Sequence, residues 1–332
     1  MKKAVHVYAV NGKSNSGDFF LGPATKWKFE NIIGDDVAWT NYDMRKVTTE
    51  KDIEFFNTFD YLILGGGGLL LPDTNPNSVS CWQWAIREEL IKKIKPDIYV
   101  LSIGYNLFYG QTVCMPNRNS NQETPQRLEI FKGNMETLIN QSKHFTMRHN
   151  GDCEELKKLV SEDVHDKINF EFCPVLEYVK EKHHPSFKND KIYHTFELKD
   201  DRINRRYHKK TQVKFYTQLL EYAYSLIRDG EKIAVMSHDG SHSFAYFLQQ
   251  NGVPFAFLDN SVANEQKIIN NYSVVKKLYC MAGHSQMTAH ALGLDYFSLI
   301  AHDKLEYFLK DVGNYTPDNF YYVNSDEEFS IV

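Results

Sequence analysis

Short apolar runs alternate with longer amphipathic stretches along most of the chain. The apolar runs predict buried strands at residues 5–10, 61–64, 98–103, 144–147, 170–174, 192–196, 233–236, 255–258, 278–283 and 296–301. The stretches between them predict helices at residues 24–33, 82–94, 128–142, 154–160, 213–228, 265–272 and 284–293. A strand followed by a helix, repeated many times, is the pattern of a parallel α/β sheet.

The chain length and one polar segment indicate the domain organisation. A length of 332 residues favours two domains rather than one. Residues 181–190 are polar, charged and contain a proline, which predicts a linker. We therefore expect an N-terminal α/β domain at residues 1–180 and a C-terminal one at residues 190–332. Residues 112–125, rich in Asn and Pro, predict a surface loop.

Composition narrows the classes of function. The formal net charge of −5 gives no reason to expect a nucleic-acid partner. Aromatic residues make up 14% of the chain, which suits stacking on sugar rings as well as core packing. Five widely spaced cysteines without a CxxC pair argue against a disulfide framework or a zinc site. No run reaches the roughly 18 apolar residues of a transmembrane helix. We expect a cytoplasmic protein, with peripheral contact at the inner face of the membrane left open.

In parallel α/β sheets, ligands bind at the carboxyl ends of the strands. The first predicted strand is followed by Asn15, Gly17 and Asp18, which could hold an anion or a sugar hydroxyl. A plain turn with an Asp cap is the more ordinary interpretation. The second strand is followed by four glycines that include Gly66 and Gly67. A turn that contacts a ligand is favoured there, with close packing of a helix on the sheet as the alternative.

Basic residues also follow the predicted strands. Arg148 lies at a strand-to-helix turn, where it could bind a carboxylate or phosphate or could pair with Asp152 on the surface. His238 directly follows another strand. Arg202 and Arg206 belong to a charged cluster that predicts either a solvated helix face or the basic rim of an anion site.

Two strand ends near the C-terminus carry the most titratable groups. His284 directly follows Gly283, and His302 and Lys304 follow the next strand. A structural and a functional role are equally supported for His284. Lys304 could bind phosphate or simply begin a helix. No histidine spacing matches a metal site, so we expect acid–base chemistry by histidine, with a cation holding an anionic substrate and no metal or organic cofactor.

Several motifs in order resemble the polysaccharide pyruvyl transferase family, and the resemblance spans most of the chain. The matching segments are residues 15–18 (NSGD), 63–70 (ILGGGGLL), 102–104 (SIG), 147–149 (MRH), 283–293 and 302–304 (HDK). The resemblance implies a glycosyltransferase-B-like fold with two Rossmann-like domains that face a central cleft. It implies an acceptor side in the N-terminal domain and a donor side in the C-terminal one.

The family resemblance also implies a reaction. Pyruvate is transferred from phosphoenolpyruvate onto two hydroxyls of a sugar in a cell-surface polysaccharide or its lipid-linked precursor. By motif, His284 would be the acid that protonates the donor and Arg148 a donor ligand. The chain departs from the family pattern at Ala282, where an arginine is usual. Two alternatives follow: a sugar-nucleotide-dependent glycosyltransferase of the same fold, and a saccharide-binding variant that has lost catalysis.

Overall fold

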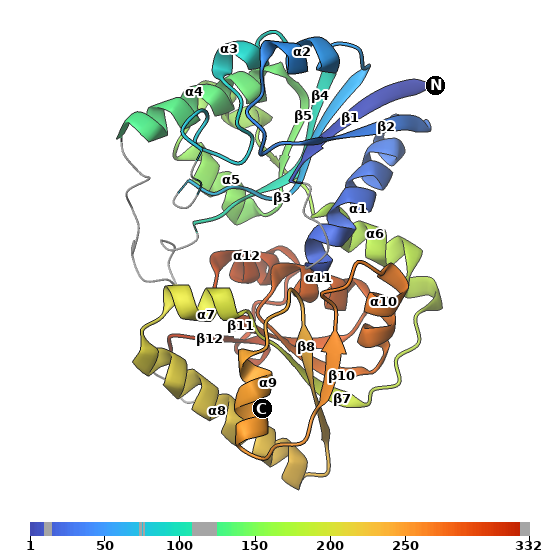
Figure 1. Cartoon of the computed structure of the whole chain (residues 1–332), viewed down its shortest axis with the longest axis vertical. Helices are drawn as coiled ribbons and strands as arrows, with labels where there is room; N and C mark the ends of the chain where they lie inside the picture. The colour runs from blue at the N-terminus through green and yellow to red at the C-terminus, as the bar shows by residue number, and fades with distance from the viewer. Residues whose placement is uncertain (10–14, 73–74, 76, 108–124, 326–332) are drawn as a thin grey trace. The chain divides into compact units, whose positions relative to one another are not determined.

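The computed structural model describes residues 1–9, 15–72, 75, 77–107 and 125–325. The chain divides into two compact units, each built on its own parallel sheet (Figure 1). Of the described residues, those of 1–9, 21–107 and 125–174 belong to unit 1, and those of 15–20 and 175–325 belong to unit 2. The long first helix therefore contributes its first turn to unit 2 and the rest of its length to unit 1.

The sheet of unit 1 has the strand order β2-β1-β3-β4-β5-β6. Its strands are β1 (Lys2–Tyr8), β2 (Val37–Asp43), β3 (Tyr61–Leu70), β4 (Asp97–Tyr105), β5 (Ser142–Met147) and β6 (Asn169–Phe170). Its helices are α1 (Ser16–Ile33), α2 (Glu50–Phe56), α3 (Glu88–Ile91), α4 (Pro125–Gln141), α5 (Asn150–Lys157) and the 3-10 helix η2 (Glu162–Lys167). Every strand pairs in parallel with its neighbours, as the alternating pattern predicts.

The sheet of unit 2 has the strand order β12-β11-β10-β7-β8-β9 and is also parallel throughout. Its strands are β7 (Tyr193–Glu197), β8 (Lys232–Ser237), β9 (Ala256–Asp259), β10 (Val275–Cys280), β11 (Asp295–Ile300) and β12 (Phe320–Tyr322). Its helices are α6 (Pro174–Lys182), η3 (His184–Ser186), α7 (Asp200–Arg206), α8 (Lys209–Arg228), α9 (Ser243–Gln250), α10 (Glu265–Ser273), α11 (Gly283–Ala291), α12 (Asp303–Asp311) and η4 (Pro317–Asn319).

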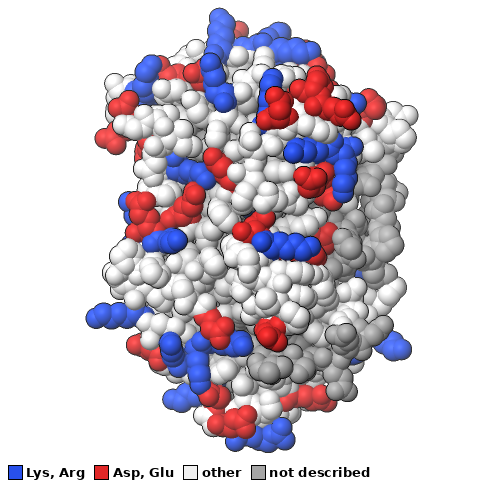
Figure 2. Space-filling view, turned by 180° about the vertical axis from the view of Figure 1, so that it is seen from behind, with Lys and Arg blue, Asp and Glu red and all other residues white. Residues whose placement is uncertain are grey.

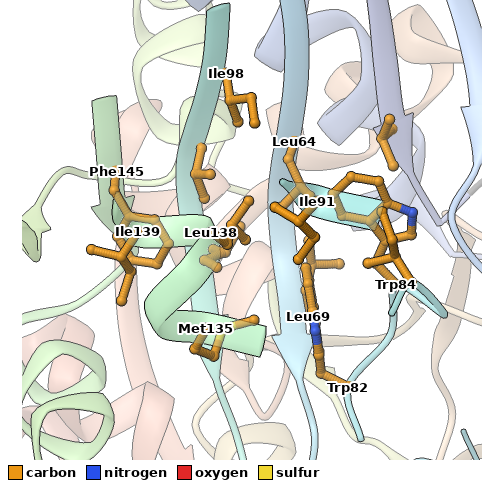
Figure 3. Close-up of a cluster of buried hydrophobic side chains, with 14 of the residues drawn as sticks. Leu64, Leu69, Trp82, Trp84, Ile91, Ile98, Met135, Leu138, Ile139 and Phe145 are labelled. Carbon is orange, nitrogen blue, oxygen red and sulfur yellow. The ribbon is translucent and has the colours of Figure 1, made fainter. Parts of the chain in front are cut away.

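Each unit has its own apolar core, because helices cover the sheet and bury the central strands on both faces. Figure 3 shows part of the core of unit 1, where Leu64 of β3 packs among side chains from α3 and α4. Two tryptophans lie in this core with their polar atoms satisfied. The indole N–H of Trp82 donates to Asn134 at 2.7 Å, and that of Trp84 donates to Thr48 at 2.9 Å.

The tryptophans explain one wrong prediction. A helix was expected over residues 82–94, but only Glu88–Ile91 is helical. The segment before it is held in a non-helical path, since both Trp82 and Trp84 are fully buried and the Ser80 hydroxyl donates to the Trp84 carbonyl at 2.5 Å. Core burial of two alternate aromatic side chains outweighs the helical periodicity of the segment.

The glycine run also differs from its predicted turn, because β3 continues through all four glycines. A Cβ on Gly65 would lie 2.2 Å from the Leu101 carbonyl oxygen of the neighbouring strand. On the other side, a Cβ on Gly66 or Gly67 would lie 2.9 Å or 3.0 Å from a methyl group of Leu21 in α1. Close packing of a helix on the sheet therefore accounts for Gly66 and Gly67, as in the alternative interpretation.

Candidate functional site

The carboxyl edge of the unit 2 sheet gathers the histidines that the sequence singled out. Four neighbouring strands, β7, β8, β10 and β11, end at this edge. Their ends lead into Lys199, His238, Ala282 and His302. The segment Asn15–Phe20 belongs to the same unit and reaches the same edge. This is the position at which parallel sheets bind ligands, and we call these residues the unit 2 edge.

The segment at the start of α1 is bonded directly to His238. The Ser16 hydroxyl lies 2.8 Å from His238 Nδ1, and the Ser16 N–H donates to the His238 carbonyl at 3.1 Å. A second hydroxyl, that of Ser285 in α11, lies 3.0 Å from the same Nδ1. Asn15 Oδ1 accepts from the N–H groups of Gly17 and Asp18 at 3.0 Å and 3.3 Å. Residues 15–18 therefore form an ordinary helix cap that also fixes His238.

His284 lies against Gly17. A Cβ built on Gly17 would be 2.1 Å from His284 Nδ1 and 2.5 Å from Cγ, so only glycine leaves room for the imidazole there. His284 occupies the first turn of α11, where the backbone N–H groups point outwards and favour negative charge. The structure thus brings together two predicted motifs that are far apart in the sequence.

His238 is neutral at physiological pH. The residue is 3% exposed, and burial together with the nearby positive charge of Lys199 lowers the pKa of its imidazole far below the ordinary value. A neutral imidazole holds a single proton on one of its two nitrogens. His238 is therefore suited to relaying or positioning a proton rather than to binding an anion by charge.

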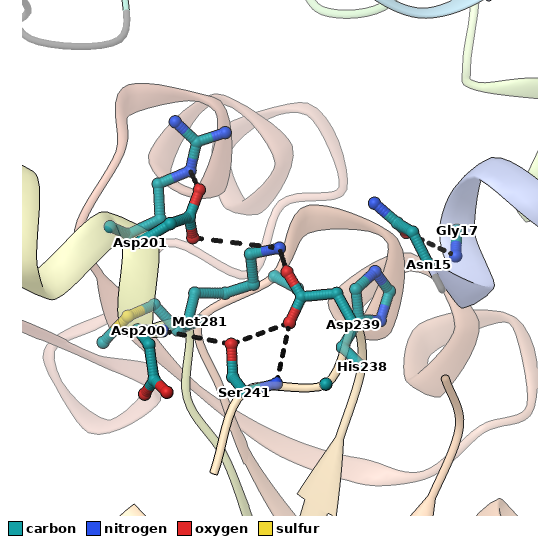
Figure 4. A network of polar contacts seen from close by, with 12 residues as sticks. Asn15, Gly17, Asp200, Asp201, His238, Asp239, Ser241 and Met281 are labelled. Carbon is teal, nitrogen blue, oxygen red and sulfur yellow. Dashed lines mark hydrogen bonds and ion pairs between the residues drawn. The ribbon is translucent and has the colours of Figure 1, made fainter. Parts of the chain in front are cut away.

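An ion-pair network lies beside His238. The Lys199 ammonium forms a close ion pair with Asp239, and it lies 3.9 Å from Asp201 (Figure 4). Ser241 donates its hydroxyl to Asp239 at 2.7 Å. Burial raises the pKa of Asp239, but the charge of Lys199 and these hydrogen bonds outweigh it and keep the pKa lowered. Sequence reasoning missed Lys199, although its place three residues after the strand predicted at residues 192–196 was a usable signal.

Glu197 is a fully buried carboxyl group at the end of β7. Its Oε2 accepts from the Ala282 N–H at 2.9 Å and from the Met281 N–H at 3.2 Å. Its Oε1 has no hydrogen-bond partner within the described part of the chain. Burial raises the pKa of Glu197 to about 7 in spite of the two N–H donors and the charge of Lys199. Sequence reasoning missed Glu197, because nothing local marks this residue as buried.

The remaining basic candidates of unit 2 have distinct environments. His302 caps α12, since its Nδ1 accepts from the Lys304 N–H at 3.3 Å. The Lys304 side chain packs along Gly283, where a Cβ would lie 3.3 Å from Lys304 Cε. Arg206 is fully buried and donates to the Ala301 carbonyl, so the predicted solvated helix face is wrong at this position. Arg202 Nε lies 3.8 Å from Asp201 Oδ2.

In unit 1, Arg148 follows β5 but lies in the interior. It is 3% exposed, and its Nε is 3.9 Å from Oδ2 of Asp152, which is fully buried. Its Nη2 donates to Asn106 Oδ1 at 3.3 Å. The guanidinium rests on bare backbone, because a Cβ on Gly104 would lie 2.3 Å from Nη2. Pairing with Asp152 is as predicted, whereas the predicted surface position is wrong.

Unit 1 also contains a cavity of about 520 Å³, formed by the segments that follow β2 and β3 in the chain. Its volume is within the usual size range of ligand pockets. It is lined by Arg45, Val47, Leu71, Asn75, Asn77, Ser78, Val79, Gln83 and Ala85. Two of these lining residues are held by Arg127 of α4, which donates to the Asn75 and Asn77 carbonyls at 3.0 Å and 3.1 Å. Three amides, one hydroxyl and the guanidinium of Arg45, which pairs with Asp43 at 3.0 Å, line the cavity together with apolar side chains, and this combination suits a polar ligand.

The described residues contain no group of three or more His, Cys, Asp or Glu that could hold a metal ion. None of the helices within the described ranges is both long and apolar enough to cross a bilayer. Basic and acidic side chains are interspersed over the face drawn in Figure 2. Cys81, Cys153, Cys173 and Cys280 are buried, and Cys114 lies outside the described residues, as does most of the predicted loop 112–125.

No protein-family model matches this sequence, and no curated protein matches it. Solved structures match the fold. Staphylococcus aureus MnaA in complex with UDP is 8% identical over 94% of this chain and 82% of its own, with a TM-score of 0.54. The UDP-GlcNAc 2-epimerase of Methanocaldococcus jannaschii is 12% identical over 98% of this chain and 96% of its own, with a TM-score of 0.48. The predicted fold class is confirmed: two parallel six-stranded sheets with flanking helices in a glycosyltransferase-B-like fold.

Proposed function

We propose that this protein is a saccharide-modifying transferase that holds a phosphorylated donor at the unit 2 edge. The observation that carries the proposal is the convergence of Ser16 and Gly17 with His238 and His284. Ser16 and His238 are 222 positions apart in the chain and share a buried hydrogen bond. Such a group of histidines, hydroxyls and helix starts at the carboxyl end of a parallel sheet suits acid–base chemistry on an anionic substrate.

Each group has a chemical task in this proposal. The first turns of α11 and α12 present backbone N–H groups, and Lys304 adds a positive charge beside them. Together they stabilise the charge that develops on a departing phosphate. His284, wedged against Gly17, exchanges a proton with the donor or with the attacking hydroxyl. His238 stays neutral and fixes the start of α1 through Ser16.

Two donors fit this arrangement, and each has its own support. A sugar nucleotide is supported by the fold shared with Staphylococcus aureus MnaA, which was solved with UDP. Phosphoenolpyruvate is supported by the ordered motifs that resemble the polysaccharide pyruvyl transferase family. Ala282, where that family usually has arginine, weakens this second donor, and Lys199 or Lys304 would have to replace the missing charge. We therefore place the sugar nucleotide first.

The two donors imply different steps. With a sugar nucleotide, an acceptor hydroxyl attacks the anomeric carbon, the bond to the nucleoside diphosphate breaks and a histidine takes the hydroxyl proton. With phosphoenolpyruvate, His284 protonates the methylene carbon, and an acceptor hydroxyl attacks C2 and returns its proton to His284. The bond between C2 and the phosphate oxygen then breaks, the phosphate leaves with the bonding electrons, and a second hydroxyl of the same sugar attacks C2 and closes the cyclic ketal, its proton passing to the departing phosphate. Neither route requires a metal or organic cofactor.

For the acceptor we propose a saccharide of a cell-surface polysaccharide or its lipid-linked precursor, modified in the cytoplasm at the membrane face. The unit 1 cavity supplies groups of the right kind, since Ser78 and Gln83 line it with a hydroxyl and a carboxamide. Glutamine and serine recognise sugar hydroxyls because each both donates and accepts hydrogen bonds.

A donor-binding experiment tests the function and separates the two donors. Calorimetric titration with UDP and, separately, with phosphoenolpyruvate should give saturable binding of one of them to the wild-type protein. His284→Ala and Lys304→Ala should lose turnover or binding of that donor, while Lys95→Ala, an exposed lysine of unit 1, should not. Incubation with acceptor glycans then distinguishes a gain of one hexose from a gain of one pyruvyl ketal by mass. Failure of both ligands to bind would contradict the proposal.

A further inference from the structure

Glu197 is a buried acid that the proposed chemistry does not use. It is the last residue of β7 and is fully buried, an unusual state for a carboxyl group that has no cation in direct contact among the described residues. Its partners are instead two successive backbone N–H groups, those of Met281 and Ala282. The Met281 N–H also donates to the Glu197 carbonyl at 3.0 Å, so the turn after β10 is bonded to this residue at three points.

The turn that Glu197 holds is the one that carries His284. Met281 and Ala282 directly precede Gly283, where α11 begins, and Ala282 is the N-cap of that helix. The Ala282 side chain makes no capping hydrogen bond. The position of His284 against Gly17 therefore depends on a turn whose backbone is fixed by the Glu197 carboxyl group.

We propose that Glu197 is a positioning residue that sets the place of His284 by binding the Met281 and Ala282 N–H groups, and that it does so most firmly as a carboxylate. Hydrogen bonds to an ionised acceptor are shorter and roughly twice as strong as those to a neutral one. Ionisation of this group therefore tightens the turn, and protonation loosens it.

The surroundings of Glu197 place its ionisation in the physiological pH range. Burial raises the pKa of Glu197 to about 7, which is where such a switch is sensitive. Lys199 faces it from the β7–α7 connection and lowers the pKa, whereas Asp239, after β8, raises it. Cys280 of β10 and Tyr272 of α10 also interact with it and are neutral at these pH values, since burial raises the pKa of each.

The proposed effect of Glu197 on donor binding rests on the proposed function. The hydrogen bonds from the Met281 and Ala282 N–H groups to Glu197, which we call the clamp, can be measured without any substrate. Selective 15N labelling of methionine and alanine reports the Met281 and Ala282 amides, which are assigned by Met281→Leu and Ala282→Gly. We expect both amide resonances to titrate with a midpoint near pH 7, the pKa of Glu197. In Glu197→Gln the two resonances should not shift with pH. In Asp239→Asn their midpoint should lie at a lower pH than in the wild type, because the Asp239 charge raises the pKa of Glu197.

The functional consequence is measured on the same proteins with UDP and with phosphoenolpyruvate. Wild-type affinity for the donor that binds should rise about threefold to tenfold through neutral pH, because the carboxylate form holds the turn. Glu197→Gln should keep the low-pH affinity throughout. Glu221→Gln, an exposed carboxylate of α8, is the matched control and should follow the wild type.

Static Met281 and Ala282 amides in the wild-type protein between pH 5.5 and 8.5 would overturn the proposal, whether or not Glu197→Gln folds. Equal titration of these amides in wild type and Glu197→Gln would also overturn it, and so would identical pH profiles of donor affinity in the two proteins. If neither donor binds at any pH, the proposed function fails, and the amide titration still decides whether Glu197 clamps the turn.

Discussion

Both units bury a charged group beneath the carboxyl edge of their sheets, but they hold it in opposite ways. In unit 1 the group is a cation, Arg148, which lies on the bare backbone of Gly104 and pairs with the buried Asp152. In unit 2 the group is an acid, Glu197, whose hydrogen-bond donors among the residues that the structure describes are two backbone N–H groups. A guanidinium never loses its charge near neutral pH, whereas this carboxyl group does.

This difference indicates a division of labour. The edge of unit 1 is a fixed structure, since glycines admit a permanently charged group and an ion pair neutralises it. The edge of unit 2 contains histidines and a carboxyl group with a raised pKa, and groups with shifted pKa values gather where chemistry takes place. Under the proposed function, Arg148 therefore has a mainly structural role and the chemistry takes place in unit 2.

The largest effect is expected in unit 1. Arg148→Met should lower the free energy of unfolding by about 3–5 kcal/mol, because removing one partner of a buried ion pair leaves the other charge uncompensated. The double variant Arg148→Met with Asp152→Asn should recover a substantial part of this loss. Urea unfolding followed by circular dichroism measures both. A loss below about 1 kcal/mol, together with a loss of donor binding, would instead make Arg148 a ligand-binding residue.

The second change concerns stability as a function of pH in unit 2. The pKa of Glu197 is raised in the folded state to about 7 from an ordinary 4.5, so the folded state keeps a proton that the unfolded state releases. The protonated group therefore contributes roughly 3 kcal/mol to the free energy of unfolding below about pH 4.5. This contribution is lost as the pH rises to about 7. Glu197→Gln should flatten this part of the curve of unfolding free energy against pH. An unchanged slope between pH 5 and 7 would show that Glu197 is not the titrating group.

Much of the fold follows from the sequence, because its strands are short apolar runs between amphipathic helices. Edge strand β2 (Val37–Asp43) was missed, since it is partly exposed and has no continuous apolar run. The glycine run was read as a turn because glycine is rare inside strands. The positive φ angles of Gly65 and Gly67 explain it together with the approach of Leu101 to Gly65 and of Leu21 to Gly66 and Gly67, and neither contact is visible in local sequence.

The candidate site was predictable to a smaller extent. His238 and His284 could be found because each follows a predicted strand. Pairing with Asp152 was one of two alternatives left open for Arg148, and the structure contains that pair. The burial of that pair depends on Gly104 in another strand, and the burial of Glu197 depends on a turn more than 80 residues away. Because long-range packing of this kind buries Glu197 and thereby raises its pKa, local sequence patterns do not reveal the raised pKa.

The third change tests the contact between the two motifs of unit 2. Gly17→Ala should destabilise the protein by about 1–3 kcal/mol, because its Cβ would overlap the His284 ring. Donor binding should weaken as well, since the ring must move. Gly22→Ala is the matched control in the same helix, where the nearest atom to the new Cβ is 3.7 Å away in Tyr8. That variant should change the stability by less than about 1 kcal/mol, because Pro23 follows it in the helix and offsets the gain in helix propensity. Equal stability of the two variants would mean that His284 does not occupy this position.

The smallest effects concern the two hydroxyls that share His238 Nδ1. A ring nitrogen carries either one proton or one lone pair, so one hydroxyl is enough to satisfy it. Ser16→Ala and Ser285→Ala should each cost less than about 1 kcal/mol, because the other hydroxyl remains at 3.0 Å or 2.8 Å.

The double variant Ser16→Ala with Ser285→Ala should cost about 1–2 kcal/mol more than the sum of the two single variants, since it leaves a buried nitrogen without a partner. A double-mutant cycle of urea unfolding at pH 7.5 measures this excess. Additive losses would indicate that only one of the two hydroxyls bonds to His238 in solution. The start of α1 would then be joined to the unit 2 edge by the backbone bond from Ser16 and the contact of Gly17 with His284, and not by a shared histidine.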